Sequence, residues 1–400
     1  MPAASGNRPE VDPRDARARD LVAYYRHPAK GPLLREAVLP YAERCAAEGL
    51  TVHVERHWLH GPHLRLRIDG PADRCAAAAE RGAAELRRWI TRHPSVSDLD
   101  ERALLDRAAE AGRIELIAPP YGPLVPDNTV RIEPVDRAPL RALIGPDGVE
   151  LRDELLALGL APLRSGSAFL GEHGDSPTAR VQLAVAALAA HAAAHPGGLV
   201  GGHYSFVSHL EDFLVHDDAD GSLRAAFERR WKSTGPAVTR LVGRIAEGGA
   251  VGGAEGGATG ALGWERDWAA WSAGAWRLTE RRHAAGADLH GFPLEYRVRA
   301  AATGDAGAVE RWNQDIRTRY SEFHRLLRRS DPDGRMWSRP DYLVYRACTN
   351  ALYRLFTVCD VRPVERYLAA YLVVRAVPAL TGHDWREEIG RVIAAVERLS

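Results

Sequence analysis

The strongest constraint on the fold lies between residues 52 and 68, where two alternating segments flank a tight turn. In the first segment Val52 and Val54 alternate with polar residues, and in the return segment Leu64, Leu66 and Ile68 alternate with basic ones. A period of two is typical of strands that bury one face. The connecting His-Gly-Pro sequence supplies a turn. The pattern therefore predicts an antiparallel hairpin.

The segments around this hairpin predict a sheet layer. An aliphatic run at 21–25 is typical of a strand, and residues 32–49 carry apolar side chains at helical spacing and end at a glycine. A second helix is predicted over 71–90 and a further strand over 128–134. The order strand, helix, strand, strand, helix, with one later strand, favours a split-βαβ, ferredoxin-like antiparallel sheet with helices on one side.

Beyond this layer the apolar spacing is mostly helical, so we predict an α+β protein with a largely helical C-terminal portion. A disordered tail is expected over residues 1–19, an α+β sheet layer over 20–140 and a mainly helical catalytic portion over 141–400. The Gly- and Ala-rich segment 247–263 cannot bury a core, and we expect a flexible insertion there. The tryptophans that follow predict a packing stripe on one helix, at Trp264, Trp268, Trp271 and Trp276.

Composition excludes some classes of function. Lys plus Arg equal Asp plus Glu at 53 each, so charge gives no reason to expect non-specific binding to nucleic acid or to an acidic membrane. We find neither a signal-peptide core nor an apolar run of membrane-spanning length, and we expect a cytoplasmic protein. The four cysteines form no CxxC pair and are expected to be reduced core thiols: Cys45, Cys75, Cys348 and Cys359.

The hairpin carries the first candidate site. His63, Arg65 and Arg67 share one face of the return strand, because residues two apart project to the same side. This face is either the solvated outside of the sheet or a clamp for anionic and carbonyl oxygens, which arginine binds well. The register decides which residues of the first strand join it, either His53, Glu55 and His57, or Arg56 and Trp58.

Histidines near the turn raise the question of zinc. His57, His60 and His63 are split by the turn, and neither a cysteine nor an acidic residue completes a usual ligand spacing. We therefore predict no metal site.

The segment GGHYSFVSHLEDFLVH, residues 201–216, carries the second candidate site. We expect a helix from Ser205, and Ser208 with Glu211 would form an S-x-x-E capping box if Ser208 is the N-cap. A capping box would explain why Ser208 and Glu211 are present, but it would not explain the presence of His209 and Tyr204. A helix start stabilises oxygen-rich ligands, and Ser, His and Tyr can move protons there. A hydrolytic triad is disfavoured because no G-x-S-x-G segment appears.

These segments resemble a known family. The hairpin RHWLHGPHLRLRI is similar to the glutamate-elimination domain of lanthipeptide dehydratases, and more closely to the stand-alone relatives that act as thiopeptide pyridine synthases. Four other segments are similar to the latter in order and spacing. They are LVAYYRHPAKGPLLREAVLPYAERC, PDNTVRIEPVD, HYSFVSHLEDFL and TNALYRLFTVCDVRPVERYLAAYLV.

The resemblance implies a cofactor-free enzyme that matures a ribosomally made peptide. Its substrate would be a precursor peptide with a leader, azoles and two dehydroalanines, which are joined into a pyridine macrocycle with loss of water and leader. The leader would dock in a groove of the sheet layer, and other enzymes of the pathway or a second copy of the chain are further partners to expect. Protons would be moved by Tyr204, Ser205, Ser208 and His209. Substrate would be held by Arg56, His57, His63, Arg65, Arg67, Glu211, Tyr345 and Asn350.

One departure from the family pattern keeps two alternatives open. If Asn350 matches the asparagine of the H-M-H-C-N-R-L-like segment of elimination domains, Arg346 stands where their histidine base belongs. This places simple glutamate elimination in doubt. A lyase subunit acting on glutamylated Ser or Thr, and a non-catalytic protein that only binds the precursor, remain the rivals.

Overall fold

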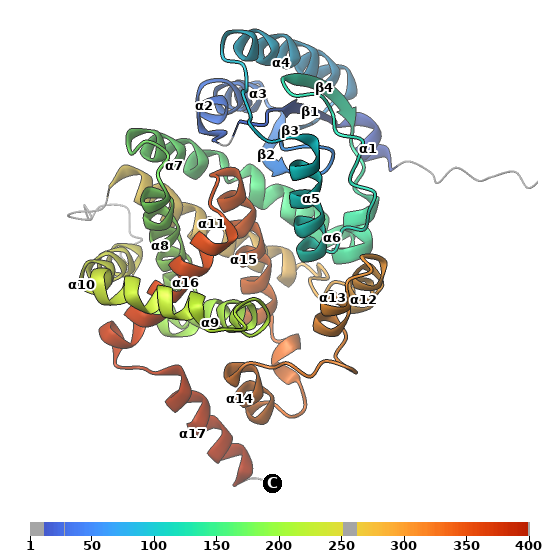
Figure 1. The fold of residues 1–400 in the computed structure, drawn as a ribbon. Helices are drawn as coiled ribbons and strands as arrows, with labels where there is room; N and C mark the ends of the chain where they lie inside the picture. The colour runs from blue at the N-terminus through green and yellow to red at the C-terminus, as the bar shows by residue number, and fades with distance from the viewer. Residues whose placement is uncertain (1–11, 28, 251–261, 399–400) are drawn as a thin grey trace, which may run out of the picture.

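The computed structural model describes residues 12–27, 29–250 and 262–398. Its N-terminal layer is built on one antiparallel sheet with the order β2-β3-β1-β4 (Figure 1). This is the predicted split-βαβ, ferredoxin-like arrangement, and the α+β class is confirmed. The strands are β1 (Arg19–Tyr24), β2 (Thr51–His57), β3 (His63–Asp69) and β4 (Thr129–Pro134).

Helices cover the apolar face of this sheet. Leu21, Leu64 and Leu66 lie on that face and are 1% exposed, because α3 and α4 pack over it. Burial of these alternating positions is what fixes the register of the hairpin. The helices of the layer are α1 (Pro13–Arg17), α2 (Gly31–Leu33), the π-helical turn η1 (Leu34–Val38), α3 (Leu39–Ala47), α4 (Ala72–Arg92), α5 (Glu101–Glu115) and α6 (Ala138–Ala157).

The N-terminal segment is ordered further upstream than predicted. Of the expected tail 1–19, residues 13–17 form α1 and Arg19 begins β1, while residues 1–11 lie outside the described part. Asp15 is buried, and Arg137 donates to its carboxylate at 2.7 Å. A buried ion pair with a residue more than a hundred positions away is a long-range constraint that local composition does not show.

The rest of the described chain is helical, as predicted. Helix α8 lies at the centre and packs against α9, α10 and α16, while α17 stands at the end of the molecule opposite the sheet (Figure 1). The helices are α7 (Leu160–Glu172), α8 (Pro177–Ala193), α9 (Gly198–Asp217), α10 (Ser222–Ala250), α11 (Gly263–Ala284), α12 (Pro293–Ala302), α13 (Ala306–Trp312), α14 (Glu322–Ser330), the 3-10 turn η2 (Arg335–Ser338), α15 (Pro340–Val358), α16 (Pro363–Thr381) and α17 (Trp385–Glu397).

Helix α10 is one long helix that contains Pro236 in its interior. One boundary in this portion differs from the prediction. Of the predicted insertion 247–263, residues 247–250 extend α10 and Gly263 begins α11, and the remainder lies outside the described residues.

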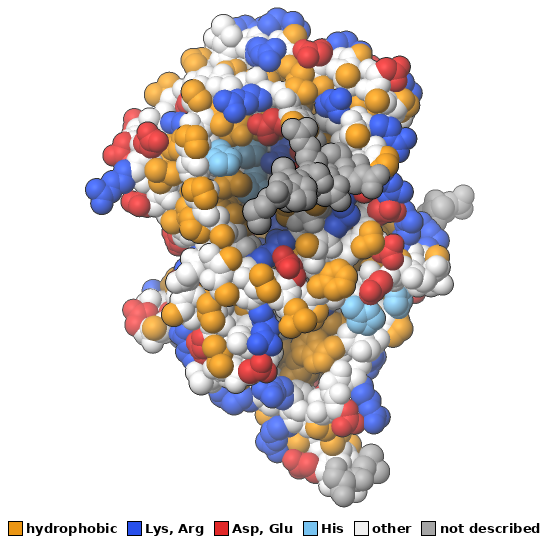
Figure 2. Space-filling model, turned by 90° about the vertical axis from the view of Figure 1, so that its right-hand side faces the viewer, with side chains coloured by type: hydrophobic (Ala, Val, Ile, Leu, Met, Phe, Trp, Pro, Cys, Tyr) orange, Lys and Arg blue, Asp and Glu red, His pale blue; other side chains and the backbone are white. Residues whose placement is uncertain are grey.

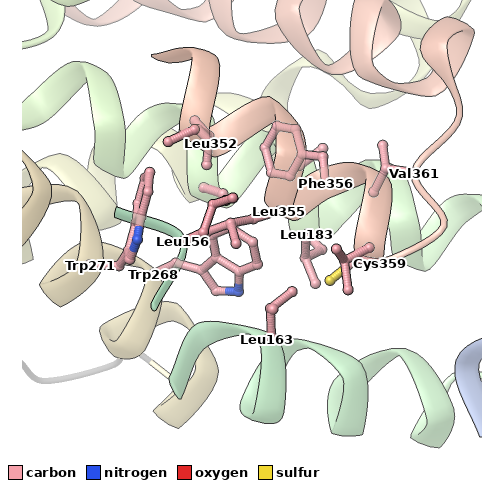
Figure 3. Packing of buried hydrophobic residues seen from close by; sticks show 14 of the residues in the cluster. Leu156, Leu163, Leu183, Trp268, Trp271, Leu352, Leu355, Phe356, Cys359 and Val361 are labelled. Atoms are coloured by element: carbon pink, nitrogen blue, oxygen red, sulfur yellow. The ribbon is translucent and has the colours of Figure 1, made fainter. Parts of the chain in front are cut away.

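A tryptophan-rich core holds the helical portion together. Trp268 is fully buried and Trp271 is 3% exposed, and Leu355 and Phe356 of α15 pack around them (Figure 3). The Trp268 ring lies 5.7 Å from that of Phe356. This confirms the predicted packing stripe for Trp264, Trp268 and Trp271, whereas Trp276 is only partly buried and lies against His195. The four cysteines are buried free thiols, also as expected. No helix in the described ranges combines the length and apolar character needed to cross a membrane.

A glycine sets the distance between α8 and α9. A Cβ atom at Gly202 would lie 2.5 Å from the Cα atom and carbonyl oxygen of Ala192, and backbone cannot move aside cheaply. We expect Gly202→Ala to lower the free energy of unfolding by about 1–3 kcal/mol through overpacking. At Gly274, inside α11, nothing lies within 4 Å of such a Cβ, so Gly274→Ala should raise it by about 0.5–1 kcal/mol. Urea denaturation of both variants checks this, and equal stabilities would contradict it.

Candidate functional site

A large cavity lies between the sheet layer and the helical portion. Its volume is about 2400 Å³, and its walls come from α5, α6, α9, α12, α13, α15 and the first turn of α16. Figure 2 shows the side of the molecule on which α6, α12 and α13 lie, where hydrophobic side chains are recessed among basic and acidic ones. The volume exceeds that of most small-molecule pockets and suits an extended ligand such as a peptide.

Helix α9 turns one face to this cavity. Tyr204, Ser205, Ser208 and His209 all line it, because residues three and four apart share a face of a helix. The structure therefore brings together the four residues predicted to move protons. Asp212 continues the same row.

Their position along the helix was predicted wrongly. Helix α9 begins at Gly198 with Gly197 as its N-cap, so Ser205 and Ser208 lie in its interior. Ser208 is not a cap, and no free helix-start amides surround it. Glu211 points to Arg224 instead, in a pair with oxygen–nitrogen distances of 3.0 and 2.8 Å. The capping box and the oxygen-binding helix start are both excluded.

Two hydrogen-bonded groups extend from this face. The Ser208 hydroxyl lies 3.0 Å from Nε2 of His324, whose Nδ1 is 2.7 Å from the hydroxyl of Ser321. Nδ1 of His209 lies 3.0 Å from the Tyr353 hydroxyl. Burial, together with the positive charge of Arg366, lowers the pKa of His209 to about 4. His209 is therefore neutral near pH 7 and can accept a proton.

Helix α15 contacts α9 and forms the next part of the wall. Tyr345 is 6% exposed, lines the cavity and stacks on His191 with ring centroids 4.4 Å apart. Its hydroxyl has no hydrogen-bond partner among the described residues, and burial raises its pKa well above the usual value. A buried phenol without a partner is a donor available to a ligand. Asn350, one and a half turns on, is exposed and also lines the cavity.

Arg346, the residue at the position of the expected histidine base, also lines the cavity. Its guanidinium donates to the backbone carbonyls of Leu289 and His290, the latter at 2.8 Å. These two hydrogen bonds connect α15 to the segment that precedes α12. A guanidinium held in this way remains charged and cannot replace a histidine as a proton acceptor.

The hairpin contributes less to the cavity than predicted. The register pairs His53, Glu55 and His57 with Arg67, Arg65 and His63. Arg56 and His57 line the cavity, with Arg56 in an ion pair with Asp360. His63, Arg65 and Arg67 do not line it.

Arg67 has a partner within the sheet instead. It is 4% exposed and donates to both carboxylate oxygens of Asp20, at 2.9 and 2.8 Å. Such a paired, buried arginine is engaged in holding the sheet face. His57 and His63 stack with centroids 5.7 Å apart, and in the described ranges no group of three His, Cys, Asp or Glu side chains is arranged to hold a metal ion.

The cavity wall is more basic than the chain as a whole. Fifteen Lys and Arg residues line it against eight Asp and Glu, whereas the chain is balanced. The resulting positive potential favours anionic or oxygen-rich ligands. The basic residues are Arg26, Lys30, Arg56, Arg107, Arg113, Arg152, Arg180, Arg297, Arg311, Arg319, Arg339, Arg346, Arg354, Arg362 and Arg366, and the acidic ones are Glu110, Glu115, Asp175, Asp212, Asp217, Asp341, Asp360 and Glu388.

We expect the protein to lose stability in acid because of His191, the buried histidine that stacks on Tyr345. Burial lowers the pKa of His191 to about 3, against roughly 6.5 in an unfolded chain. Between these values the unfolded state binds the extra proton, so stability falls as pH falls. We expect His191 to account for a loss of about 2 kcal/mol in unfolding free energy from pH 7 to pH 5. Urea denaturation at pH 7 and pH 5 measures the unfolding free energy that each protein loses between the two pH values. His191→Gln should lose about 2 kcal/mol less than the wild type, and an equal loss in both proteins would contradict the prediction.

Sequence reasoning missed part of this site. His324, from α14, completes the Ser208 group, and Arg366, from α16, lies beside His209. Each is more than a hundred residues away from its partner on α9. The TNALYRLFTVCDVRPVER segment was noted for its resemblance, and it contains Tyr353 and Arg366, but nothing in its spacing indicates that they meet α9.

No protein-family model and no curated protein sequence matches this chain. Solved structures do match its fold. One is the pyridine synthase TbtD from thiomuracin biosynthesis, with a TM-score of 0.65 and 20% identity over 92% of this chain and 99% of that one. Another is TsrL, with a TM-score of 0.59 and 18% identity over 94% of this chain and 97% of that one. The resemblance predicted from sequence segments is thus confirmed at the level of the fold.

Proposed function

We propose that this chain is a pyridine synthase-like enzyme that converts two dehydroalanines of a precursor peptide into a pyridine macrocycle. The observation that carries the proposal is the near full-length fold match to TbtD, combined with a peptide-sized cavity lined by α9 and α15. Fold alone does not determine chemistry, so the proposal depends on what the residues of this cavity can do.

The proposed reaction balances without an oxidant. One amide of the core peptide tautomerises to an iminol, which forms a C=C–N=C unit with its dehydroalanine. This unit adds to the C=C bond of the second dehydroalanine, and two new C–C bonds close a six-membered ring. Loss of the hydroxyl group as water and of the leader as a carboxamide leaves an aromatic pyridine. Holding the two reacting units together can supply about 7–11 kcal/mol in favourable cases.

The remaining barrier lies in proton transfers, which we assign to the cavity face of α9. His209 is neutral and takes or returns the amide proton, and Ser208 with His324 serves the departing hydroxyl or leader nitrogen. Tyr204 and Ser205 lie one turn away on the same face. Substrate oxygens are held by the Tyr345 hydroxyl, Asn350, Arg56 and His57 on the other walls. We leave His63, Arg65, Arg67 and Glu211 out of the proposed site because they do not line the cavity.

The leader has a candidate docking edge. In the sheet order, β2 and β4 are the edge strands, and α6 and α15 pack against β2. Strand β4, against which α4 packs, is the other edge, and we propose that an extended leader adds along it by main-chain hydrogen bonds. In this proposal the leader lies along the sheet layer and the core peptide lies in the cavity.

Mass spectrometry of the purified protein with a leader-bearing peptide tests the function. The peptide carries azoles and two dehydroalanines, and the expected products are a pyridine macrocycle and a leader ending in a carboxamide. A glutamylated Ser/Thr precursor is offered in parallel. Loss of glutamate from it without pyridine formation would identify a lyase, and binding of both peptides without any conversion would identify a precursor-binding protein.

A further inference from the structure

One arginine in the cavity wall lacks the partner that its neighbours have. Arg56 pairs with Asp360, Arg180 with Glu365 and Arg311 with Asp212. Arg366 is partly buried, yet no carboxylate or carbonyl among the described residues accepts a hydrogen bond from its guanidinium, and its Nε atom is buried without a partner. Because a guanidinium has five N–H donors, one whose Nε is buried and whose donors find no acceptor among the described residues is available to a ligand that supplies the oxygens.

Two tyrosines hold this guanidinium in place. Its central carbon lies 4.4 Å from the ring centroid of Tyr353 and 4.8 Å from that of Tyr367. Tyr367 is itself stacked on Phe213, with centroids 3.9 Å apart and an interplanar angle of 8°. Cation–π contacts fix the group while leaving the N–H edge free for oxygen atoms. The arginine is thus preorganised without being neutralised.

The same tyrosine connects Arg366 to His209. The Tyr353 hydroxyl is 3.0 Å from Nδ1 of His209, and no hydrogen bond from Nε2 to a described residue is formed. The charged or titratable groups that act on His209 are Arg366 from α16, His324 from α14, Arg311 from α13 and Asp212 from α9. A cation and a neutral imidazole therefore lie side by side at one point of the cavity wall.

We propose that Arg366 binds the oxygen of the substrate amide whose proton His209 accepts, and so promotes the tautomerisation that starts ring formation. This inference rests on the proposed function. With its own proton on Nδ1, donated to Tyr353, His209 takes the amide proton at Nε2. The nitrogen electron pair forms the C=N bond, and the C=O π electrons move onto the oxygen held by Arg366. Return of the proton to that oxygen gives the iminol, so atoms and charge balance.

Turnover of Arg366 variants tests the role. Arg366→Gln should lower kcat by about 10²- to 10³-fold with little change in KM, since a preorganised donor acts on charge that develops in the transition state. Arg366→Lys keeps the charge without the planar fork and should recover part of this loss. Removing the cation should also raise the pKa of His209 and move the acid limb of the kcat profile to higher pH. Arg88→Gln, at an exposed arginine of α4 outside the cavity lining, is the matched control and should leave kcat unchanged. Wild-type kcat in Arg366→Gln would overturn the proposal.

A binding measurement separates this inference from the proposed function. The probe is the leader-bearing peptide with both dehydroalanines replaced by alanine, and the readout is the NMR signal of the His209 ring. Saturation with this peptide should shift the signal in the wild-type protein and not in Arg366→Gln. A shift that depends on Arg366 supports the oxygen site even if no pyridine is ever formed, in which case only the proposed function fails. An equal shift in both proteins, or none in the wild type, overturns the site.

Discussion

Replacing His209 with glutamine is expected to slow pyridine formation by about 10²- to 10⁴-fold, the usual contribution of a positioned acid–base group. His209 lies on the cavity face of α9 and is neutral at working pH, since burial and the nearby Arg366 lower its pKa to about 4. Glutamine keeps a similar size and can still contact Tyr353, but it cannot accept a proton. Single-turnover rates followed by mass spectrometry measure the effect, with circular dichroism to verify the fold.

His290→Gln is the matched control for this experiment. His290 also lines the cavity, but its ring is largely exposed and bonded to Asp288 at 2.9 Å. Its replacement should leave the rate close to that of the wild type. If His209→Gln turned over as fast as His290→Gln, the assignment of proton transfer to α9 would be wrong.

Trp268→Ala is expected to lower the free energy of unfolding by about 3–5 kcal/mol, which is a large part of the stability of a typical protein. Trp268 is fully buried and packs against Phe356 of α15 (Figure 3). The fit is tight, because a Cβ atom at Gly166 would lie 2.8 Å from its indole nitrogen. Alanine leaves a void that the surrounding helices cannot fill without moving. Guanidinium denaturation measures the loss.

Trp337→Ala provides the comparison of the same chemical change at the surface. Trp337 is 47% exposed, so its removal should cost about 0.5 kcal/mol or less. Similar losses for the two variants would show that the α11–α15 contact is not what stabilises the helical portion.

Local sequence pattern determined the sheet layer. Alternation at Val52, Val54, Leu64 and Leu66 predicts the hairpin, because a strand places neighbouring side chains on opposite faces and only one face can be buried. The spacing of Tyr204, Ser205, Ser208 and His209 likewise places them on one helix face wherever that helix begins. These are consequences of backbone geometry, and they need no knowledge of the rest of the chain.

The start of α9 shows where local pattern fails. Gly201 and Gly202 suggest a break before the helix, since glycine has a low helix propensity. In the structure both are helical, and Gly202 is needed because the backbone of Ala192 leaves no room for a Cβ atom. Packing against α8 overrides the propensity, so Ser208 is an interior residue and not a cap.

The partners of the candidate groups were decided by tertiary structure alone. Arg67 faces the same way as the sequence predicts, but Asp20 on the neighbouring strand neutralises it, whereas Arg366 is left without an acidic partner and beside His209. Periodicity fixes the direction of a side chain relative to its own helix or strand. Whether that direction leads to a counter-charge, to a histidine or to an open cavity depends on distant segments. Asp20 lies 47 residues from Arg67, and His209 lies more than a hundred residues from Arg366, and only the packing of the whole chain brings them together.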